Sequence, residues 1–155
     1  MNKFFNVSEA LSIGVHLCVR LARQPERFCP TSEVAAEFGF SSHHVAKVVQ
    51  KLAKAGIVET VRGSRGGARL TRAAAGTALS EIAAAVGEPP PEGCLLSREV
   101  CAGNRCLLGH FFNEQNQRLA SVLRETTLQT VADSLYAQAD ASPSTPASKP
   151  RKAKT

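Results

Sequence analysis

The first part of the chain carries apolar and polar positions in a helical pattern. Between residues 8 and 24 the apolar residues fall three or four positions apart and form one stripe: Leu11, Val15, Cys18 and Ala22, widened by Ile13, Leu17 and Leu21. This spacing is typical of an α-helix with one buried side. Because the stripe is wide, the pattern predicts a first helix that is mostly buried.

Two shorter helices are expected next, joined by a tight glycine turn. Thr31 or Ser32 can cap the first of them, and Gly39 ends it because glycine adopts a left-handed backbone at little cost. The second runs from residue 42 to about residue 55 and stops at Gly56. Its two faces differ sharply in polarity: Val45, Val48, Val49 and Leu52 on one, and His43, His44, Lys47, Gln50, Lys51 and Lys54 on the other. A basic second helix after such a turn is typical of the helix-turn-helix motif.

A β-hairpin is expected directly after this helix pair. Residues 57–61 read Ile-Val-Glu-Thr-Val, residues 62–67 read Arg-Gly-Ser-Arg-Gly-Gly, and residues 68–70 read Ala-Arg-Leu. Two short strands around a glycine-rich tip predict a hairpin. A helix-turn-helix followed by a basic hairpin is the pattern of a winged helix, in which the hairpin is the wing.

The residues expected to contact DNA lie at the start of the second helix of the pair and at the wing tip. Amide and hydroxyl groups at a helix N-terminus favour phosphate oxygens, and neighbouring side chains can reach base edges. The two arginines at the tip present cationic groups that suit phosphate or a narrow minor groove. The predicted DNA-binding residues are Ser41, Ser42, His43, His44, Lys47, Arg62, Gly63, Ser64 and Arg65.

The second part of the chain predicts a short helix, a cysteine-rich loop and a long helix. Thr77 can cap the short helix, which ends at Gly87, and three prolines at residues 89–91 form a stiff connector. A helical stripe then continues to a break at Thr126 and Thr127: Leu107, Leu108, Phe111, Phe112, Leu119, Val122 and Leu123. The second of these threonines can cap a last short helix. Because a small winged domain cannot bury so long a stripe alone, the long helix is expected to mediate a homodimer.

These elements predict a mainly α fold with a small β-hairpin wing, in which a winged helix-turn-helix DNA-binding domain is joined to a long dimerisation helix. Four segments are expected: the winged domain at residues 1–88, a cysteine-rich sensor loop at residues 89–106, the dimerisation helix and a short terminal helix at residues 107–137, and a disordered basic tail at residues 138–155. The tail is expected to be disordered because it is rich in Pro, Ser and Ala and lacks periodicity.

Length and composition narrow the class of protein. A chain of 155 residues suits one domain with an ordinary core, and a formal net charge of +6 suits a polyanionic partner. No run approaches the roughly 18 apolar residues of a membrane helix, and no secretory signal pattern is present, so we expect a cytoplasmic protein without membrane contact. The sequence contains no nucleophile–base pair and no phosphate-cradling loop, so we expect neither an enzyme nor a small-molecule substrate.

Three cysteines before the long helix are the strongest indication of a metal or redox site in the sequence. Cys94, Cys101 and Cys106 are separated by six and four residues, and His110 follows the last of them by one helical turn. Four interpretations are open, namely iron–sulfur ligation, a thiol or disulfide switch, structural zinc, and inert cysteines. A cluster is favoured because the C-x2-C spacing usual for zinc is absent and a disulfide switch would leave one cysteine spare.

The remaining cysteines are expected to play no chemical role. Cys18 lies on the apolar stripe of the first helix and is expected in the core. Cys29, in a loop with prolines on either side, is expected to be an incidental exposed thiol.

Several sequence segments match a known family. The run VRGSRGGARL directly follows AGIVET, the helix before it begins SSHHVAKVVQKL, and three cysteines precede a long helix. In these features the chain resembles, over about residues 8–135, the bacterial winged-helix regulators typified by the cluster regulator IscR and the nitric-oxide-sensing repressor NsrR. The resemblance implies a homodimer that binds a palindromic operator in double-stranded DNA. It also implies a [2Fe-2S] or [4Fe-4S] cluster on the three cysteines and one further ligand.

The resemblance leaves the further ligand open. Some members use an acidic residue of the first helix, but the matching position here is Ser12, a poor iron ligand. His16, one turn later, matches a position that another branch of the family uses, and Glu9 lies one turn before Ser12. His110 is the local candidate and is preferred, with His16 or Glu9 as the alternative. Without a ligand role, His16 would be a hydrogen-bonded core histidine.

The sequence therefore predicts a dimeric transcriptional regulator, expected to be a repressor, whose operator affinity depends on a cluster at Cys94, Cys101 and Cys106. The signal would be redox state, nitric oxide or iron–sulfur status. The alternatives are a regulator with a cysteine thiol or disulfide switch, a constitutive DNA-binding protein, and, from another class, a small iron–sulfur redox protein. The wing and the basic helix argue against the last of these.

Overall fold

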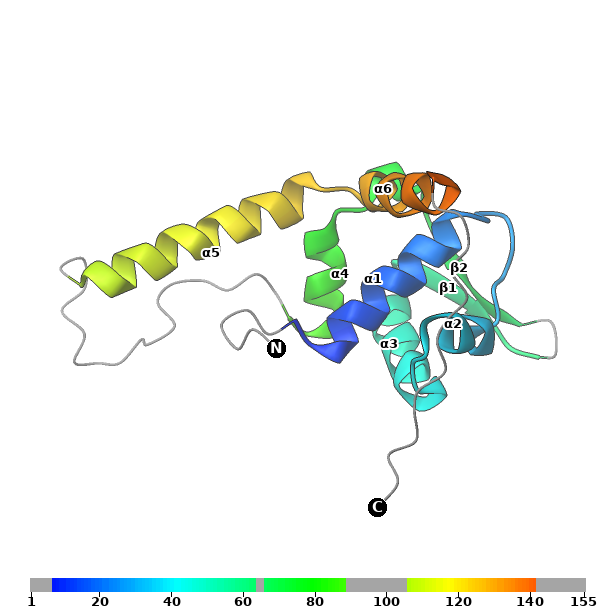
Figure 1. Cartoon of the computed structure of the whole chain (residues 1–155). Coiled ribbons are helices and arrows are strands. Elements are labelled where there is room, and N and C mark those ends of the chain that lie inside the picture. Colours follow the sequence, from blue (N-terminus) through cyan, green and yellow to red (C-terminus); the bar gives the residue numbers. More distant parts are fainter. Residues whose placement is uncertain (1–6, 64–65, 89–105, 142–155) are drawn as a thin grey trace, which may run out of the picture.

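A computed structural model describes residues 7–63, 66–88 and 106–141. The first helix, α1 (Glu9–Ala22), lies at the centre of the fold (Figure 1). The side chain of Ser8 caps it by accepting a hydrogen bond from the Leu11 N–H. Its buried apolar side chains are Ile13, Leu17, Cys18, Val19 and Leu21. The prediction of a mostly buried helix is therefore confirmed.

The side of α1 that is most buried differs from the expected stripe. Leu11, Val15 and Ala22 are only half-buried, whereas Ile13 and Leu17, which were expected to widen the stripe, are fully enclosed. The difference arises because α1 contacts α3, α4, α6 and β2 at once, so tertiary packing rather than local spacing decides which side faces the core.

The helix pair is α2 (Thr31–Phe38) and α3 (Ser42–Lys54). Gly39 ends α2 in the left-handed region with φ +71°, as expected. The expected cap at Thr31 or Ser32 is wrong, because Pro30 occupies the N-cap position and no side chain caps the helix. Ser41 is the N-cap residue of α3, and its side chain makes no capping hydrogen bond. The expected apolar face of α3 is confirmed: Val45, Val48, Val49 and Leu52 are all buried.

The wing consists of β1 (Val58–Val61) and β2 (Gly67–Leu70), which pair antiparallel with Val58 opposite Leu70. The loop before α2 adds a bridge on the other edge of β2. Cys29 and Ala68 exchange two backbone hydrogen bonds of 2.9 Å each. This bridge buries Cys29, which is 1% exposed, so the expectation of an exposed thiol is wrong.

After a short 3-10 turn at Ala74–Gly76, helix α4 runs from Leu79 to Val86. Thr77 does not cap it. The N-cap residue is Ala78, whose N–H donates to the carboxylate of Glu81 at 3.0 Å, while Thr77 is fully buried and its hydroxyl accepts a hydrogen bond from Arg72. Gly87 ends α4 with φ +91°, as expected.

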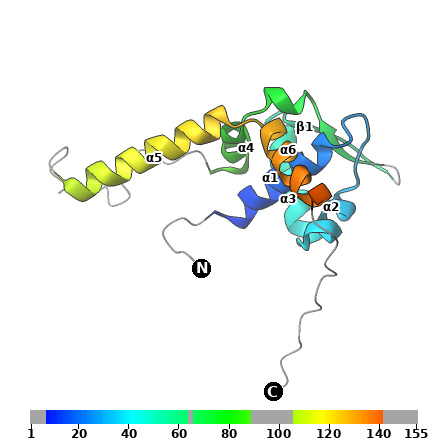
Figure 2. The same ribbon diagram turned by 45° about the horizontal axis from the view of Figure 1, so that its top comes forward.

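The long helix α5 (Leu107–Glu125) projects away from the rest of the fold, as both views show (Figure 1 and Figure 2). It ends at Thr126, and the hydroxyl of Thr127 accepts a hydrogen bond from the Thr130 N–H at the start of α6 (Leu128–Ala141). The expected break and cap are confirmed. Helix α6 continues into the first residues expected to form the tail, and residues 142–155 lie outside the described part.

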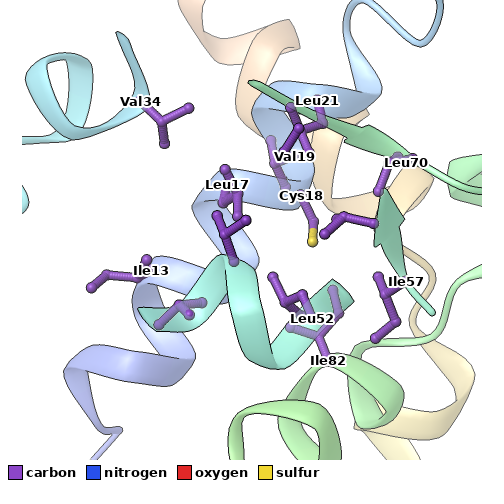
Figure 3. Close-up of a cluster of buried hydrophobic side chains, with 14 of the residues drawn as sticks. Ile13, Leu17, Cys18, Val19, Leu21, Val34, Leu52, Ile57, Leu70 and Ile82 are labelled. Carbon is purple, nitrogen blue, oxygen red and sulfur yellow. The ribbon is translucent and has the colours of Figure 1, made fainter. Parts of the chain in front are cut away.

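Helix α6 returns to the winged domain and packs on α1. Leu128 and Ala132 belong to the same buried cluster as the side chains of α1, α3 and the wing, part of which appears in Figure 3. The expectation that Cys18 is a core residue is confirmed, because it is fully buried with its sulfur directed into this cluster (Figure 3). Burial raises the pKa of its thiol to about 12. Within the described residues, none of the helices combines the length and apolar character needed to cross a membrane.

Candidate DNA-binding surface and cysteine region

The start of α3 presents a polar surface to solvent. Ser41, Ser42, His43, His44 and Lys47 are all exposed. The acidic side chain of Glu9, at the start of α1, lies 3.1 Å from the Nδ1 atom of His44. The side chain of His44 therefore has an acidic partner within the fold. The side chains of His43 and Lys47 make no hydrogen bond or ion pair with other described residues.

The described part of the wing tip comprises Arg62, Gly63 and Gly66; Ser64 and Arg65 lie outside the described residues. Arg62 is exposed, and Gly63 has φ +117°, a conformation that side-chain-bearing residues rarely adopt. A Cβ atom on Gly66 would collide with the carbonyl oxygen of Val61. The glycines of the RGSRGG run therefore permit a turn that keeps Arg62 at the surface.

A groove of about 620 Å³ separates α3 from the wing. The residues that line it come from three elements: Thr31 and Ser32 at the start of α2, Ala46 and Gln50 of α3, and Thr60 and Arg62 of the wing, with neighbouring glycines, two valines, one further alanine and a proline. None of the described lining residues is acidic. An open groove with hydroxyl, amide and guanidinium groups suits a polyanionic strand rather than a cation.

Several residues of this groove were not among the predicted DNA-binding residues, and three of them, Thr31, Ser32 and Gln50, are polar residues outside the wing. The sequence pattern predicts Thr31 and Ser32 as helix caps and Gln50 as part of the polar face of α3. The fold brings them opposite Arg62 because the wing folds back beside the helix pair. A usable sequence signal did exist, since hydroxyl side chains at a helix N-terminus are common in phosphate contacts.

Of the predicted cluster cysteines, Cys106 lies within the described residues, and Cys94 and Cys101 lie outside them. Cys106 is exposed and is the N-cap residue of α5, where its Sγ accepts a hydrogen bond from the Gly109 N–H at 3.3 Å. Amides at a helix N-terminus stabilise negative charge on such an atom. His110, also exposed, follows one turn later and donates its backbone N–H to the Cys106 carbonyl at 2.9 Å.

The alternative ligand residues lie on α1. The Nδ1 atom of His16 is 2.7 Å from the carbonyl oxygen of Ser12, and the ring packs edge-on against Phe38 and Phe40. Because a carbonyl can only accept, Nδ1 carries the proton in the neutral ring and Nε2 keeps its lone pair. Glu9 faces His44 instead. Within the described residues, no three His, Cys, Asp or Glu side chains gather closely enough to hold a metal ion.

The donor set still fits an iron–sulfur cluster in chemical terms. Cys106 offers a soft sulfur with access to solvent and an amide donor beside it, and His110 offers an imidazole on the next turn. Thiolate with one nitrogen ligand is compatible with such clusters.

Comparison with known proteins supports the class of DNA-binding transcriptional regulators. The model of the Rrf2 family, described as iron-dependent transcriptional regulators, matches residues 7–134. An HTH-type transcriptional regulator IscR from Vibrio atlanticus is 33% identical over 100 residues, which cover 64% of this chain and 58% of that protein. An HTH-type transcriptional regulator NsrR from Geobacillus kaustophilus is 34% identical over 106 residues, which cover 66% of this chain and 70% of that protein.

The fold also matches solved structures. The structure of CymR, the global cysteine regulator of Bacillus subtilis, superposes with a TM-score of 0.71 and covers 84% of this chain and 98% of that one. Sequence identity in this comparison is 21%, so it establishes the likeness of the fold alone.

Proposed function

The chain belongs to the Rrf2 family of transcriptional regulators, and from this premise we propose that it is a homodimeric repressor with a cysteine-based sensor. As a member of this family it is a DNA-binding regulator rather than an enzyme. The proposal adds the form of its DNA complex, its oligomeric state and the chemistry to which it responds.

The DNA-binding part of the proposed function rests on the groove between α3 and the wing. It is lined by hydroxyl, amide and guanidinium groups, with no acidic side chain among its described lining residues. Helix α3 would enter the major groove of a palindromic operator with Ser42, His43 and Lys47 leading, and the wing tip would enter the minor groove. One strand of the sugar–phosphate backbone would pass between them.

The dimer would form through α5. Leu107, Leu108, Phe111 and Val122 are between 48% and 86% exposed, although they are large and apolar. A helix that projects from its own domain with such a surface gains stability by pairing with a second copy. Two copies would place two α3 helices at the two halves of the operator.

The sensor would be an iron–sulfur cluster held by Cys94, Cys101 and Cys106, with His110 as the fourth ligand and His16 or Glu9 as the alternative. When bound, the cluster would supply a centre that responds to oxidants and nitric oxide. Cys106 supports this role because it is exposed and its sulfur already accepts an amide hydrogen bond at the start of α5. The donor on Gly109 would stabilise the charge of a ligating thiolate.

The test is an anaerobic purification of the wild type and of Cys101→Ala, each measured by visible absorption and by iron and sulfide assays. The cluster proposal predicts a coloured wild type that contains iron and sulfide, and a variant that has lost most of both. Operator affinity, measured before and after treatment with nitric oxide, should change by about 5- to 150-fold for the wild type only.

A thiol switch is the second candidate, and the exposure of Cys106 favours it. A colourless wild type without iron or sulfide would overturn the cluster and leave this candidate. Peroxide would then be expected to lower the number of free thiols by two and to change operator affinity, and Cys106→Ser should abolish that response if Cys106 is one of the pair.

A further inference from the structure

Val86, the last residue of α4, is held by two neighbouring helices. Its side chain is 2% exposed, and its Cγ1 atom packs so closely on α1 that a Cβ added to Gly14 would lie 3.2 Å from it. Its carbonyl oxygen accepts a hydrogen bond of 2.6 Å from the Nζ atom of Lys51 in α3. The end of α4 is therefore connected to the recognition helix by a charged hydrogen bond.

The electrostatics of this position favour the contact. The last carbonyl groups of a helix lack intrahelical donors and carry partial negative charge, so an ammonium group is stabilised beside them. A hydrogen bond from a charged donor is also stronger than one between neutral groups. Lys51 lies on the polar face of α3, and this contact directs its ammonium to α4.

The other end of α3 is connected as well. His44, in the first turn, lies 3.1 Å from the carboxylate of Glu9 in α1. Helix α3 is thus attached near its start to α1 and near its end to α4. Because α3 also packs against both helices, a displacement of α4 relative to α1 would change the orientation of α3.

Helix α4, which the Lys51 hydrogen bond connects to α3, directly precedes the cysteine region in the chain. Helix α4 ends at Val86, and residues 89–105, which include Cys94 and Cys101, begin shortly after Gly87 and Glu88. In the chain, these cysteines are connected to the winged domain through Glu88 and Gly87, directly after the end of α4. The hydrogen bond from Lys51 lies at that point.

We propose that Lys51 is a positioning residue that couples the state of the cysteine region to the orientation of α3. The proposal rests on the proposed function, because it requires that the cysteines control operator binding. The Lys51 ammonium contacts the C-terminus of α4, and through this contact it transmits a shift of that end to α3.

The test uses the full-length protein and the substitution Lys51→Met, which removes the donor and keeps the aliphatic stem. Lys54→Met is the matched control, because it removes the same charge from the same last turn of α3 and the Lys54 ammonium makes no hydrogen bond to other described residues. Operator affinity is measured for anaerobic protein and for protein treated with peroxide. The ratio of the two affinities reports coupling, whereas a simple loss of positive charge lowers both equally.

We expect Lys51→Met to reduce this ratio at least fivefold relative to the wild type, and Lys54→Met to leave it unchanged. Lys51→Arg, which keeps a charged donor, should restore most of the ratio. Lys51→Gln, whose shorter side chain cannot reach Val86, provides the same test if the methionine variant does not fold.

Two outcomes would overturn the inference, and they are distinguishable. If the wild type responds to peroxide and Lys51→Met responds equally, the coupling role of Lys51 is wrong while the sensor remains. If the wild type itself shows no change with peroxide or nitric oxide, the sensor part of the proposed function is wrong and the coupling role is wrong with it.

Discussion

Gly67 lies where the second strand of the wing passes the loop before α2. A Cβ atom at this position would collide with the carbonyl of Cys29 and would lie 2.8 Å from the Pro30 nitrogen. Both neighbours are backbone atoms fixed by the bridge between Cys29 and Ala68, so neither can move cheaply. Gly67→Ala should therefore lower the free energy of unfolding by about 1–3 kcal/mol, as overpacking of a well-packed site does.

Urea denaturation measures this loss, and Gly76→Ala is the control. Gly76 has open space where its Cβ would be, so this substitution should change the free energy of unfolding by less than about 0.5 kcal/mol. Equal stabilities of the two variants would show that the backbone contact at Cys29 does not constrain the wing.

The buried thiol of Cys18 predicts a pH dependence of stability. In the unfolded chain this thiol ionises near its ordinary pKa of 9.0, whereas burial raises the pKa in the native state to about 12. Between these values the native state holds a proton that the unfolded state has lost, so the free energy of unfolding falls as pH rises. The slope from this one group approaches about 1.4 kcal/mol per pH unit.

Denaturation of the wild type and of Cys18→Ala at several pH values above about 8 isolates this contribution. The alanine variant should be less stable near pH 8, because it leaves a small cavity, but its stability should fall less steeply at higher pH. Parallel curves would contradict the assignment of the raised pKa to Cys18.

At the scale of elements, the helix pair and the wing could be predicted because their signals are local. The apolar face of α3 follows from spacing within one helix, and the turns at Gly39 and Gly87 follow from a single glycine each. The helix caps were less predictable, because several neighbouring residues at a helix start can occupy the N-cap position. Pro30, one residue before the expected Thr31, is the N-cap residue of α2. Ala78, whose N–H donates to Glu81, takes the N-cap position of α4 in place of Thr77.

The errors that involve distant residues have one physical origin. The burial of Cys29 depends on Ala68, and the buried side of α1 depends on helices that come later in the chain. Thr31 and Ser32 likewise line the groove only because the wing folds back beside them. Spacing within one segment contains no information about such partners.

Helix α5 predicts an oligomeric state that a single substitution can change. Leu108, Phe111 and Val122 are each about half exposed, and a rotation of about 100° per residue places them within about 60° of one another on the helix. In a dimer built on this surface, Phe111→Glu would bury a charge without a partner. We expect the dissociation constant of the dimer to rise at least about 100-fold, which corresponds to roughly 2.7 kcal/mol.

Analytical ultracentrifugation over a range of concentrations measures this change. Gln117→Glu is the control, because it adds the same charge on an exposed position of the opposite side of α5 and should leave the dimer intact. A wild type that stays monomeric at all concentrations would refute the dimer, and equal effects of the two substitutions would place the interface elsewhere.

At the scale of the whole molecule, the excess of positive charge matters only where it faces DNA. The formal net charge is +6, but several cations are engaged within the fold: Arg20 with Glu37, Arg69 with Glu59, Arg72 with Glu81, and Lys51 with the end of α4. Arg62 differs from these, because it is exposed and lines the groove beside α3 without an acidic partner among the described residues.

This difference can be measured through the salt dependence of operator binding. Each contact between a cation and a phosphate contributes about 0.9 to the slope of log affinity against log salt concentration. Arg62→Gln should therefore make the slope less steep by about 0.9 for each protomer, and should weaken binding most at low salt. Arg23→Gln removes the same charge from the end of α1, where the guanidinium lies over the ring of Tyr136 and away from the groove. This control should leave the slope unchanged. If both substitutions reduce the slope equally, the operator responds to total charge alone, and the groove between α3 and the wing is not the path of the phosphate backbone.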